Sequence, residues 1–171
     1  MRTDRLQVRF IREEDWRSIQ AIWEDFKQTE YVFYDTCKNT EDEEVKNRIA
    51  KWAHVTRSGK DHLFFAVCLD GEVIGYTSLN IREGGYEIGY GFRNKAQGRG
   101  YAKESLCVIL DYMKSLGTEK IYAGTALKNT PSVRLLKCLG FELTGTETLS
   151  FHKDSDGNEV YFDGGLFEKY L

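Results

Sequence analysis

The spacing of apolar residues changes near residue 60, and this change limits the folds that the chain can adopt. Before that point apolar side chains recur at helical spacing, as Trp16, Ile19 and Trp23 illustrate. After it they form short blocks separated by the turns Asp70-Gly71 and Gly84-Gly85, as in strands joined by tight turns. We therefore predict two successive helices, followed by three antiparallel strands at residues 63–69, 73–79 and 86–92.

The rest of the chain predicts four further strands and two further helices. A half-buried first strand covers residues 6–10, and Thr40 with Glu43 forms a capping box at the start of the second helix. Gly117 and Gly140 stand where glycine ends a helix, and Thr130 is the predicted N-cap of the last one. The remaining strands are expected at residues 120–127, 141–151 and 160–167. The order is typical of an α+β layered fold, with a mostly antiparallel sheet and one domain over residues 1–171.

Composition excludes several classes of protein. The chain has 171 residues, 41% of them apolar, and carries 24 basic against 27 acidic side chains. It is too apolar for a disordered protein, and a sequence pI near 5.7 argues against a nucleic-acid partner. Its longest apolar run, residues 63–69, is far too short to span a membrane, and residues 1–10 lack the apolar core of a signal peptide. We expect a cytoplasmic globular protein.

The cysteines and histidines do not predict a metal site. The four cysteines are spread evenly without a C-x-x-C pair, which favours small buried side chains in a reducing compartment. The histidines are isolated and lack metal-binding spacing, so we expect structural or surface roles for them. The residues concerned are Cys37, Cys68, Cys107, Cys138, His54, His62 and His152.

Glycine is concentrated in one part of the chain. Six of the 16 glycines fall between residues 84 and 100. Strand interiors normally avoid glycine, so Gly89 and Gly91 require a physical reason. Either a ligand approaches the strand backbone closely, or the strand carries a bulge, and the sequence leaves both open.

The loop at residues 97–102 leads into a long amphipathic helix. Backbone N–H groups at a helix N-terminus can bind an anion, and small residues there leave these groups accessible. The loop matches neither the dinucleotide-binding nor the phosphate-binding glycine motif, and a flexible loop on a solvated basic face is the alternative. Four cations within eleven positions would suit phosphates: Arg93, Lys95, Arg99 and Lys103.

Two motifs in this order resemble those of the GNAT superfamily, the acyl-CoA-dependent N-acetyltransferases. Residues 97–102, Gln-Gly-Arg-Gly-Tyr-Ala, match its Q/R-x-x-G-x-G/A signature. Residues 129–141, with Asn129, Ser132 and Leu-Gly-Phe at the end, resemble its second motif. Residues 6–15 and 86–90 are similar to the branch that contains ribosomal-protein N-terminal (alanine/serine) acetyltransferases. The resemblance implies a twisted, mostly antiparallel sheet with one splayed strand pair and four flanking helices.

The resemblance also implies acetyl-CoA as co-substrate and assigns residues to it. The backbone of residues 97–102 would contact the pyrophosphate, and residues 90–92 would bind the pantetheine arm as an added strand. Asn129 would reach the pantetheine, and the helix at residues 132–139 would line the thiol end. The implied CoA-binding residues are Tyr90, Gly91, Phe92, Arg93, Gln97, Gly98, Arg99, Gly100, Tyr101, Ala102, Asn129 and Leu135.

Two side chains are candidates for catalysis. An amine must lose a proton to attack a thioester, and Glu87 is the expected base or amine-orienting group, with a plain solvent-facing role as the alternative. Many family members protonate the leaving thiolate with a tyrosine on the last helix, where this chain has Leu136. Ser132 is then the candidate acid, although it could equally cap or pack that helix. A thiolate is also a tolerable leaving group, so a dedicated acid is not required.

The acceptor site is expected to include the aromatic linker and the last hairpin. The linker supplies Tyr31, Phe33 and Tyr34. Residues 142–171 hold seven acidic and two basic side chains, an excess that would attract a cationic amine. A solvated polar hairpin with no binding role is the alternative.

These residues predict an N-acetyltransferase that acts by direct attack in a ternary complex. The acceptor would be a primary amine: a peptide N-terminus, including that of a ribosomal protein, a polyamine or an aminoglycoside. A non-catalytic acyl-CoA sensor and an enzyme that uses another acyl-CoA are the alternatives. We expect no metal, nucleic acid or membrane partner, and either a monomer or a homodimer, because an exposed sheet edge can pair with a second copy.

Overall fold

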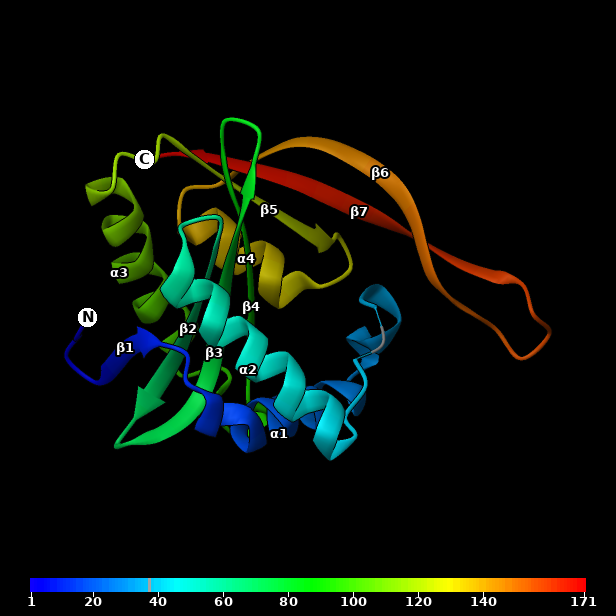
Figure 1. Cartoon of the computed structure of the whole chain (residues 1–171). Coiled ribbons are helices and arrows are strands. Elements are labelled where there is room, and N and C mark those ends of the chain that lie inside the picture. Colours follow the sequence, from blue (N-terminus) through cyan, green and yellow to red (C-terminus); the bar gives the residue numbers. More distant parts are fainter. Residues whose placement is uncertain (37) are drawn as a thin grey trace.

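A single mixed sheet organises the part of the chain that the computed structural model describes, residues 1–36 and 38–171 (Figure 1). Its seven strands lie in the order β1-β2-β3-β4-β5-β7-β6, and every neighbouring pair is antiparallel except β4 and β5. The strands are β1 (Leu6–Phe10), β2 (His62–Leu69), β3 (Glu72–Arg82), β4 (Gly85–Phe92), β5 (Lys120–Ala126), β6 (Glu142–Lys153) and β7 (Glu159–Tyr170). The predicted strand order along the chain is confirmed.

Helices cover both faces of this sheet. One face carries α1 (Trp16–Lys27) and α2 (Asp42–Ser58), and the other carries α3 (Tyr101–Ser115) and α4 (Thr130–Cys138). Three short 3₁₀ turns complete the described chain: η1 (Glu13–Asp15), η2 (Glu30–Tyr34) and η3 (Asn94–Ala96). Within residues 1–36 and 38–171, no helix has both the length and the apolar character needed to cross a bilayer.

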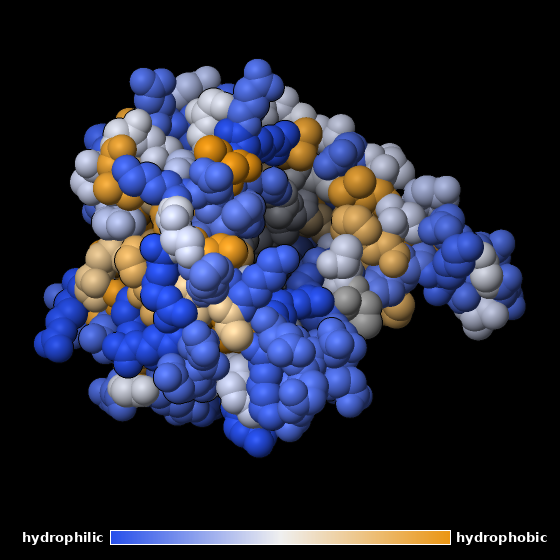
Figure 2. Space-filling view, in the orientation of Figure 1, coloured by the Kyte–Doolittle hydropathy of each residue, from blue (hydrophilic) through white to orange (hydrophobic). Residues whose placement is uncertain are grey.

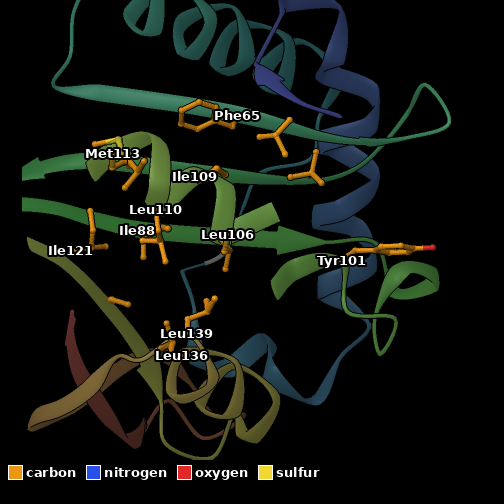
Figure 3. Packing of buried hydrophobic residues seen from close by; sticks show 14 of the residues in the cluster. Phe65, Ile88, Tyr101, Leu106, Ile109, Leu110, Met113, Ile121, Leu136 and Leu139 are labelled. Carbon is orange, nitrogen blue, oxygen red and sulfur yellow. The ribbon is translucent and has the colours of Figure 1, made fainter. Parts of the chain in front are cut away.

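Alternation along the strands divides the buried side chains into two cores. The larger core lies between the sheet and helices α3 and α4, where Ile88 of β4 and Ile121 of β5 meet Leu106 and Leu136 (Figure 3). The smaller core lies under α1 and α2, where Trp52 stacks on Phe64 with ring centroids 4.3 Å apart. Successive residues of β4 therefore face different helix layers, so Glu87 and Tyr90 lie on opposite faces of the sheet.

A buried ion pair fixes the start of α1 against the sheet. Both guanidinium Nη atoms of Arg9 lie 2.7 Å from the Asp15 carboxylate, which also accepts the Arg12 N–H at 2.8 Å. The hydrogen bond to Asp15 raises the pKa of Arg9, against an opposing effect of burial. Asp15 is only 6% exposed, so these bonds to the protein replace the hydration that its carboxylate loses.

Two of the predicted helix N-caps are wrong by one residue. The N-cap of α2 is Glu41, and Thr40 instead accepts a hydrogen bond from Lys27 Nζ at 2.8 Å. The N-cap of α4 is Asn129 rather than Thr130, because its side chain accepts the Ser132 N–H. The predicted C-terminal glycines, Gly117 and Gly140, are confirmed by φ values of 81°.

Among the three cysteines with described positions, the prediction of a buried side chain is correct for one. Cys68 of β2 is buried, as expected for a small apolar side chain. Cys107 and Cys138 are exposed, because each lies on the outer side of its helix, next to a neighbour that takes the buried position. Cys37 lies outside the described residues.

The parallel strands β4 and β5 pair over only two positions and then diverge. Tyr86 pairs with Ile121 and Glu87 with Tyr122, and no pair follows although both strands continue (Figure 1). Residues 88–92 of β4 and 123–126 of β5 therefore keep one backbone edge unpaired. We call this segment the splay; its existence confirms the splayed pair implied by the family resemblance.

The last two strands extend well beyond the sheet. β5 stops pairing with β7 at Ala126 and Gly164, whereas β6 and β7 continue to pair with each other. Residues 148–163 thus form a projecting hairpin, clearly visible in Figure 1, which we call the hairpin arm.

The junction of β4 and β5 leaves no room for a side chain at Gly85. A Cβ there would lie 2.0 Å from the backbone oxygen of Lys120, so Gly85→Ala must push the two strands apart. We expect a loss of about 1–3 kcal/mol in the free energy of unfolding, measured by urea denaturation. Gly59→Ala is the control, because nothing lies within 4 Å of its Cβ position. Equal stability of the two variants would contradict a tight junction.

Candidate active site

Glu87 stands where β4 and β5 part. It belongs to their last pair, with Tyr122, and faces Asn80 of β3 on its other side. Its side chain is 51% exposed, and the nearest cation is Arg82, with its Nη1 3.9 Å from the carboxylate. A loose, exposed contact of this kind leaves the carboxylate free to receive an amine. Glu87 lies on the sheet face of α1 and α2, and Gly124 beside it adds no side chain.

Tyr90 and Ser132 join β4 to α4 on the opposite sheet face. The phenol oxygen of Tyr90 lies 2.8 Å from the hydroxyl oxygen of Ser132, and both residues are partly buried. Burial raises the pKa of Tyr90, and the hydrogen bond with Ser132 opposes that effect. The residues are 42 positions apart in sequence, and the family resemblance implied a role only for the backbone of Tyr90.

The start of α4 is held in place by its own residues. Asn129 Oδ1 accepts the Ser132 N–H at 3.3 Å, so the oxygen of Asn129 serves as a helix cap. Leu135 packs at the edge of the larger core, and Leu136, only 1% exposed, lies inside it. Leu136 therefore has a packing role, which is consistent with the absence of a tyrosine at this position.

The glycines of β4 have a packing explanation. The register between β3 and β4 is continuous over all eight pairs, so the predicted alternative of a bulge is wrong. A Cβ at Gly91 would lie 2.7 Å from the ring of Tyr76, and one at Gly89 would lie 2.8 Å from Ser78 Oγ. Side chains of the neighbouring strand thus occupy the space above both glycines. The close approach of a ligand is not needed to account for them.

The loop at residues 97–102 presents an uncapped helix N-terminus. Gly98 and Gly100 adopt positive φ values of 71° and 81°, and Gly100 is the N-cap of α3 without a side-chain cap. Gln97 is exposed and bonds to Asn94, whereas Tyr101 is nearly buried beneath the Arg5 guanidinium, 4.6 Å from its ring centroid. Ala102 follows in the first turn. This arrangement can bind an anion through backbone N–H groups.

Only two of the four nearby cations are available to an anion. Arg93 Nε bonds to the Asp25 carboxylate at 2.7 Å, and Lys95 Nζ bonds to Glu72 at 2.6 Å. For Arg99 and Lys103, the described part of the chain contains no ion pair. Burial raises the pKa of Asp25, but the hydrogen bonds from Arg93 and Asn94 outweigh it, and the net pKa is lowered.

The predicted acceptor residues lie on η2, which packs against the hairpin arm. The ring of Tyr34 lies 5.2 Å from that of Phe162, and Phe33 lies 5.8 Å from His152. His152 Nε2 also lies 2.8 Å from the backbone oxygen of Asp35. Tyr31 packs beside Tyr34 at 6.4 Å. Figure 2 shows the surface hollowed between the arm and the body of the molecule.

The acidic residues of the C-terminal part are partly engaged. Glu168 forms an ion pair with Lys120 at 2.5 Å, Glu159 bonds to Ser150 at 2.8 Å, and Asp154 accepts N–H groups of its own turn. Glu142, Glu147, Asp156 and Asp163 are exposed. Of these, Glu142 and Glu147 lie on the same sheet face as Glu87, given the register from β4 to β6.

A recess of about 570 Å³ lies at the paired ends of β4 and β5 and is lined by the turn at residues 82–84 and by Lys120, Tyr122 and Glu168. Arg82 stacks on the ring of Tyr122, with Cζ 4.6 Å from its centroid, and Tyr122 donates to the backbone oxygen of Glu83. The pKa of Lys120 is raised, mainly by its hydrogen bond to Glu168. The recess thus combines aromatic rings with charges of both signs.

No metal centre is visible among the residues with described positions. They contain no group of three or more His, Cys, Asp and Glu side chains arranged to hold an ion. The three histidines are instead engaged singly: His54 lies near Ser58, His62 near Asn80 and His152 near Asp35.

Comparisons with known proteins agree with this fold. A family model described as acetyltransferase (GNAT) domain matches residues 5–142. An uncharacterized N-acetyltransferase, p20, of Bacillus licheniformis is 29% identical over 148 residues, covering 84% of this chain and 82% of the relative. The ribosomal-protein-S5-alanine acetyltransferase of Vibrio fischeri superposes with a TM-score of 0.82 at 21% identity, covering 99% and 95% of the two chains. The yncA acetyltransferase of Salmonella typhimurium, solved with acetyl-CoA, gives a TM-score of 0.75 at 22% identity, with coverage of 98% and 95%.

Asp25 ties the loop before α3 to α1, and its lowered pKa predicts a pH-dependent contribution to stability. A carboxyl group whose pKa is lowered in the folded state stabilises the fold at pH values above its ordinary pKa of about 3.9. This stabilisation is lost as the pH falls through the lowered pKa of the folded state. We expect Asp25→Asn to cost about 1 kcal/mol near neutral pH and little in acid, measured by urea denaturation between about pH 7 and about pH 3. The exposed Asp4→Asn is the control. A pH-independent cost would contradict the ionic role.

Proposed function

The chain belongs to the GNAT acetyltransferase family, and on that premise we propose that it transfers an acetyl group from acetyl-CoA to a primary amine. The observation that carries the proposal is the splay, whose unpaired β4 edge lies beside an uncapped helix N-terminus, with Glu87 at its closed end. An extended donor molecule with a phosphate group and a reactive thioester requires this combination.

The residues at the splay would hold the donor at two places. The unpaired backbone of Tyr90, Gly91 and Phe92 would hydrogen-bond the pantetheine arm, with Leu135 and the free amide group of Asn129 on the α4 side. The backbone from Gln97 to Ala102 would bind the pyrophosphate, assisted by the unpaired cations Arg99 and Lys103. Arg93 would act through its ion pair with Asp25, which fixes the approach to this loop, rather than through phosphate contact.

Catalysis would take place by direct attack of the amine. Glu87 would accept a proton from the amine or orient it, because its carboxylate is exposed and only loosely paired. A backbone N–H near Tyr90 would stabilise the negative oxygen that develops on the acetyl group. Ser132 would donate to the sulfur as the carbon–sulfur bond breaks.

The acceptor would enter from the face that carries Glu87, beside the contact of η2 with the hairpin arm. Tyr31, Phe33 and Tyr34 would form its aromatic wall, while Glu87 and Glu147 would attract a positive amine. A peptide N-terminus, including that of a ribosomal protein, a polyamine and an aminoglycoside all carry such an amine. The acceptor would then lie near the hollow between the arm and the body (Figure 2).

A thiol-release assay with acetyl-CoA tests the proposal. We expect CoA release above the hydrolysis background with one of three acceptor groups: ribosomal-protein N-terminal peptides, polyamines or aminoglycosides. Calorimetry with CoA runs in parallel. Tight CoA binding without turnover on any amine would favour a non-catalytic sensor, and competition by succinyl-CoA would test the use of a bulkier donor.

Arg99→Glu tests the phosphate site. Its side chain is exposed and its backbone oxygen is held by Arg5, so we expect the fold to survive the charge reversal. The affinity for CoA should fall about tenfold or more, because a negative charge would face the pyrophosphate. Calorimetry measures this, with exposed Lys51→Glu as a control for the same change in net charge. Unchanged CoA affinity in Arg99→Glu would sink the phosphate assignment.

Glu87→Gln tests the catalytic carboxylate. We expect kcat to fall about a hundredfold, with CoA affinity unchanged, because the variant loses the proton acceptor but not the donor site. Glu83→Gln makes the same substitution four residues earlier, in the exposed turn between β3 and β4, and should retain full activity. Equal rates for the two variants would show that Glu87 takes no part in the reaction.

A further inference from the structure

The hydrogen bond between Tyr90 and Ser132 connects the two elements that border the splay on the side of α3 and α4. Tyr90 lies on the unpaired stretch of β4, and Ser132 lies in the first turn of α4, with 2.8 Å between their side-chain oxygens. Neither oxygen has a second hydrogen-bond partner in residues 1–36 and 38–171. The question is therefore which of the two hydroxyl groups donates.

The chemistry of the two groups favours Tyr90 as the donor. A phenol is more acidic than an alcohol and hence the better donor, while a serine oxygen offers two acceptor lone pairs. If Ser132 donated instead, the phenol hydrogen would face surroundings that contain no other acceptor and that exclude enough water to raise the pKa of Tyr90. An unpaired donor of this kind costs about 1–3 kcal/mol.

The hydroxyl hydrogen of Ser132 then has no acceptor among the described residues. Serine in a helix usually donates to a backbone oxygen one turn back. Ser58, Ser105 and Ser115 all do so in this chain, at 2.8, 2.8 and 2.7 Å. For Ser132, the described residues include no such bond, because it lies in the first turn, where Asn129 instead caps its N–H. The backbone and the oxygen of Ser132 are thus both fixed, and its hydrogen is free.

We propose that Tyr90 is a positioning residue, which donates to Ser132 and thereby directs the hydroxyl hydrogen of Ser132 at the sulfur of CoA bound in the splay. This inference rests on the proposed function. As the carbon–nitrogen bond forms and the carbon–sulfur bond breaks, the electron pair of the broken bond stays on the sulfur, and Ser132 hydrogen-bonds to it. The amine proton passes to Glu87, and the thiolate regains a proton from solvent.

The order of donation gives Tyr90 an electronic effect as well as a geometric one. A hydroxyl group that accepts a hydrogen bond becomes a stronger donor itself, because the two bonds polarise each other. Tyr90 keeps its own proton throughout, so the phenol need not ionise. The chain therefore uses a phenol on β4 to support a serine on α4, while Leu136 fills the core.

The test compares binding of CoA with binding of desulfo-CoA, which lacks the thiol. Above the thiol pKa of about 8.5, the wild-type protein should prefer CoA about tenfold, because Ser132 donates to the thiolate. At lower pH the preference should disappear. Ser132→Ala and Tyr90→Phe should both lose the preference at high pH while retaining affinity for desulfo-CoA. Calorimetry at several pH values gives all of these ratios without knowledge of the acceptor.

Controls separate positioning from packing. Tyr86→Phe removes a phenol from the same strand and the same sheet face, and should keep the preference, since its hydroxyl has no hydrogen bond within the described chain. In a Ser132→Ala background, Tyr90→Phe should cause no further change in the preference for CoA, because both substitutions remove the same interaction. Thermal unfolding reports whether each variant is folded.

Each contrary result has a distinct meaning. A wild-type protein that binds CoA without preferring it to desulfo-CoA overturns the inference, as does a Tyr90→Phe variant that keeps the preference. Equal weakening of both ligands in Tyr90→Phe shows that Tyr90 only packs. If the wild-type protein binds neither ligand, the proposed function itself fails.

Discussion

The early end of pairing between β4 and β5 is the constraint on which the rest of the site depends. Parallel strands that stayed paired to their ends would satisfy the β4 backbone and leave no edge for a donor molecule. Here Gly85 permits the close junction, and pairing stops at Glu87 and Tyr122. Beyond this point, alternation sends Glu87 toward one helix layer and Tyr90 toward the other. One irregularity in the sheet therefore separates the proposed acceptor side from the side of α3 and α4.

Interactions on both sides of the loop between β4 and α3 fix the position of this loop before any ligand binds. Asp25 of α1 holds Arg93 and Asn94 at the loop's start, and Arg5 contacts Arg99 and Glu104 at its end. The backbone N–H groups of the α3 N-terminus are thus oriented in advance, which reduces the entropy lost on binding. A prearranged N-terminus of this kind would let a protein of net charge −3 attract a phosphate, as the proposed function requires.

Local sequence patterns predicted the elements and their order, because apolar spacing is set by burial within each segment. These patterns failed where contacts with residues distant in the sequence determine the structure. Thr40 accepts a hydrogen bond from Lys27 instead of capping a helix. The ring of Tyr76 on the neighbouring strand occupies the space that a side chain at Gly91 would need. The family resemblance is confirmed, while the individual site assignments stay predictions. The contact of Tyr90 with Ser132 could not be foreseen, since it depends on how β4 and α4 pack together.

The strand order also has a consequence for how the protein folds. β7 is the last strand in sequence, yet it lies inside the sheet between β5 and β6. β6 therefore has no strand to join until β7 has formed, and the pairing of Ala126 with Gly164 must close a long stretch of chain. Closing such loops makes folding slow. The pairing of Phe10 with Phe65 closes a still longer stretch, so both ends of the sheet depend on slow long-range closure, whereas β6 and β7 can pair locally as a hairpin.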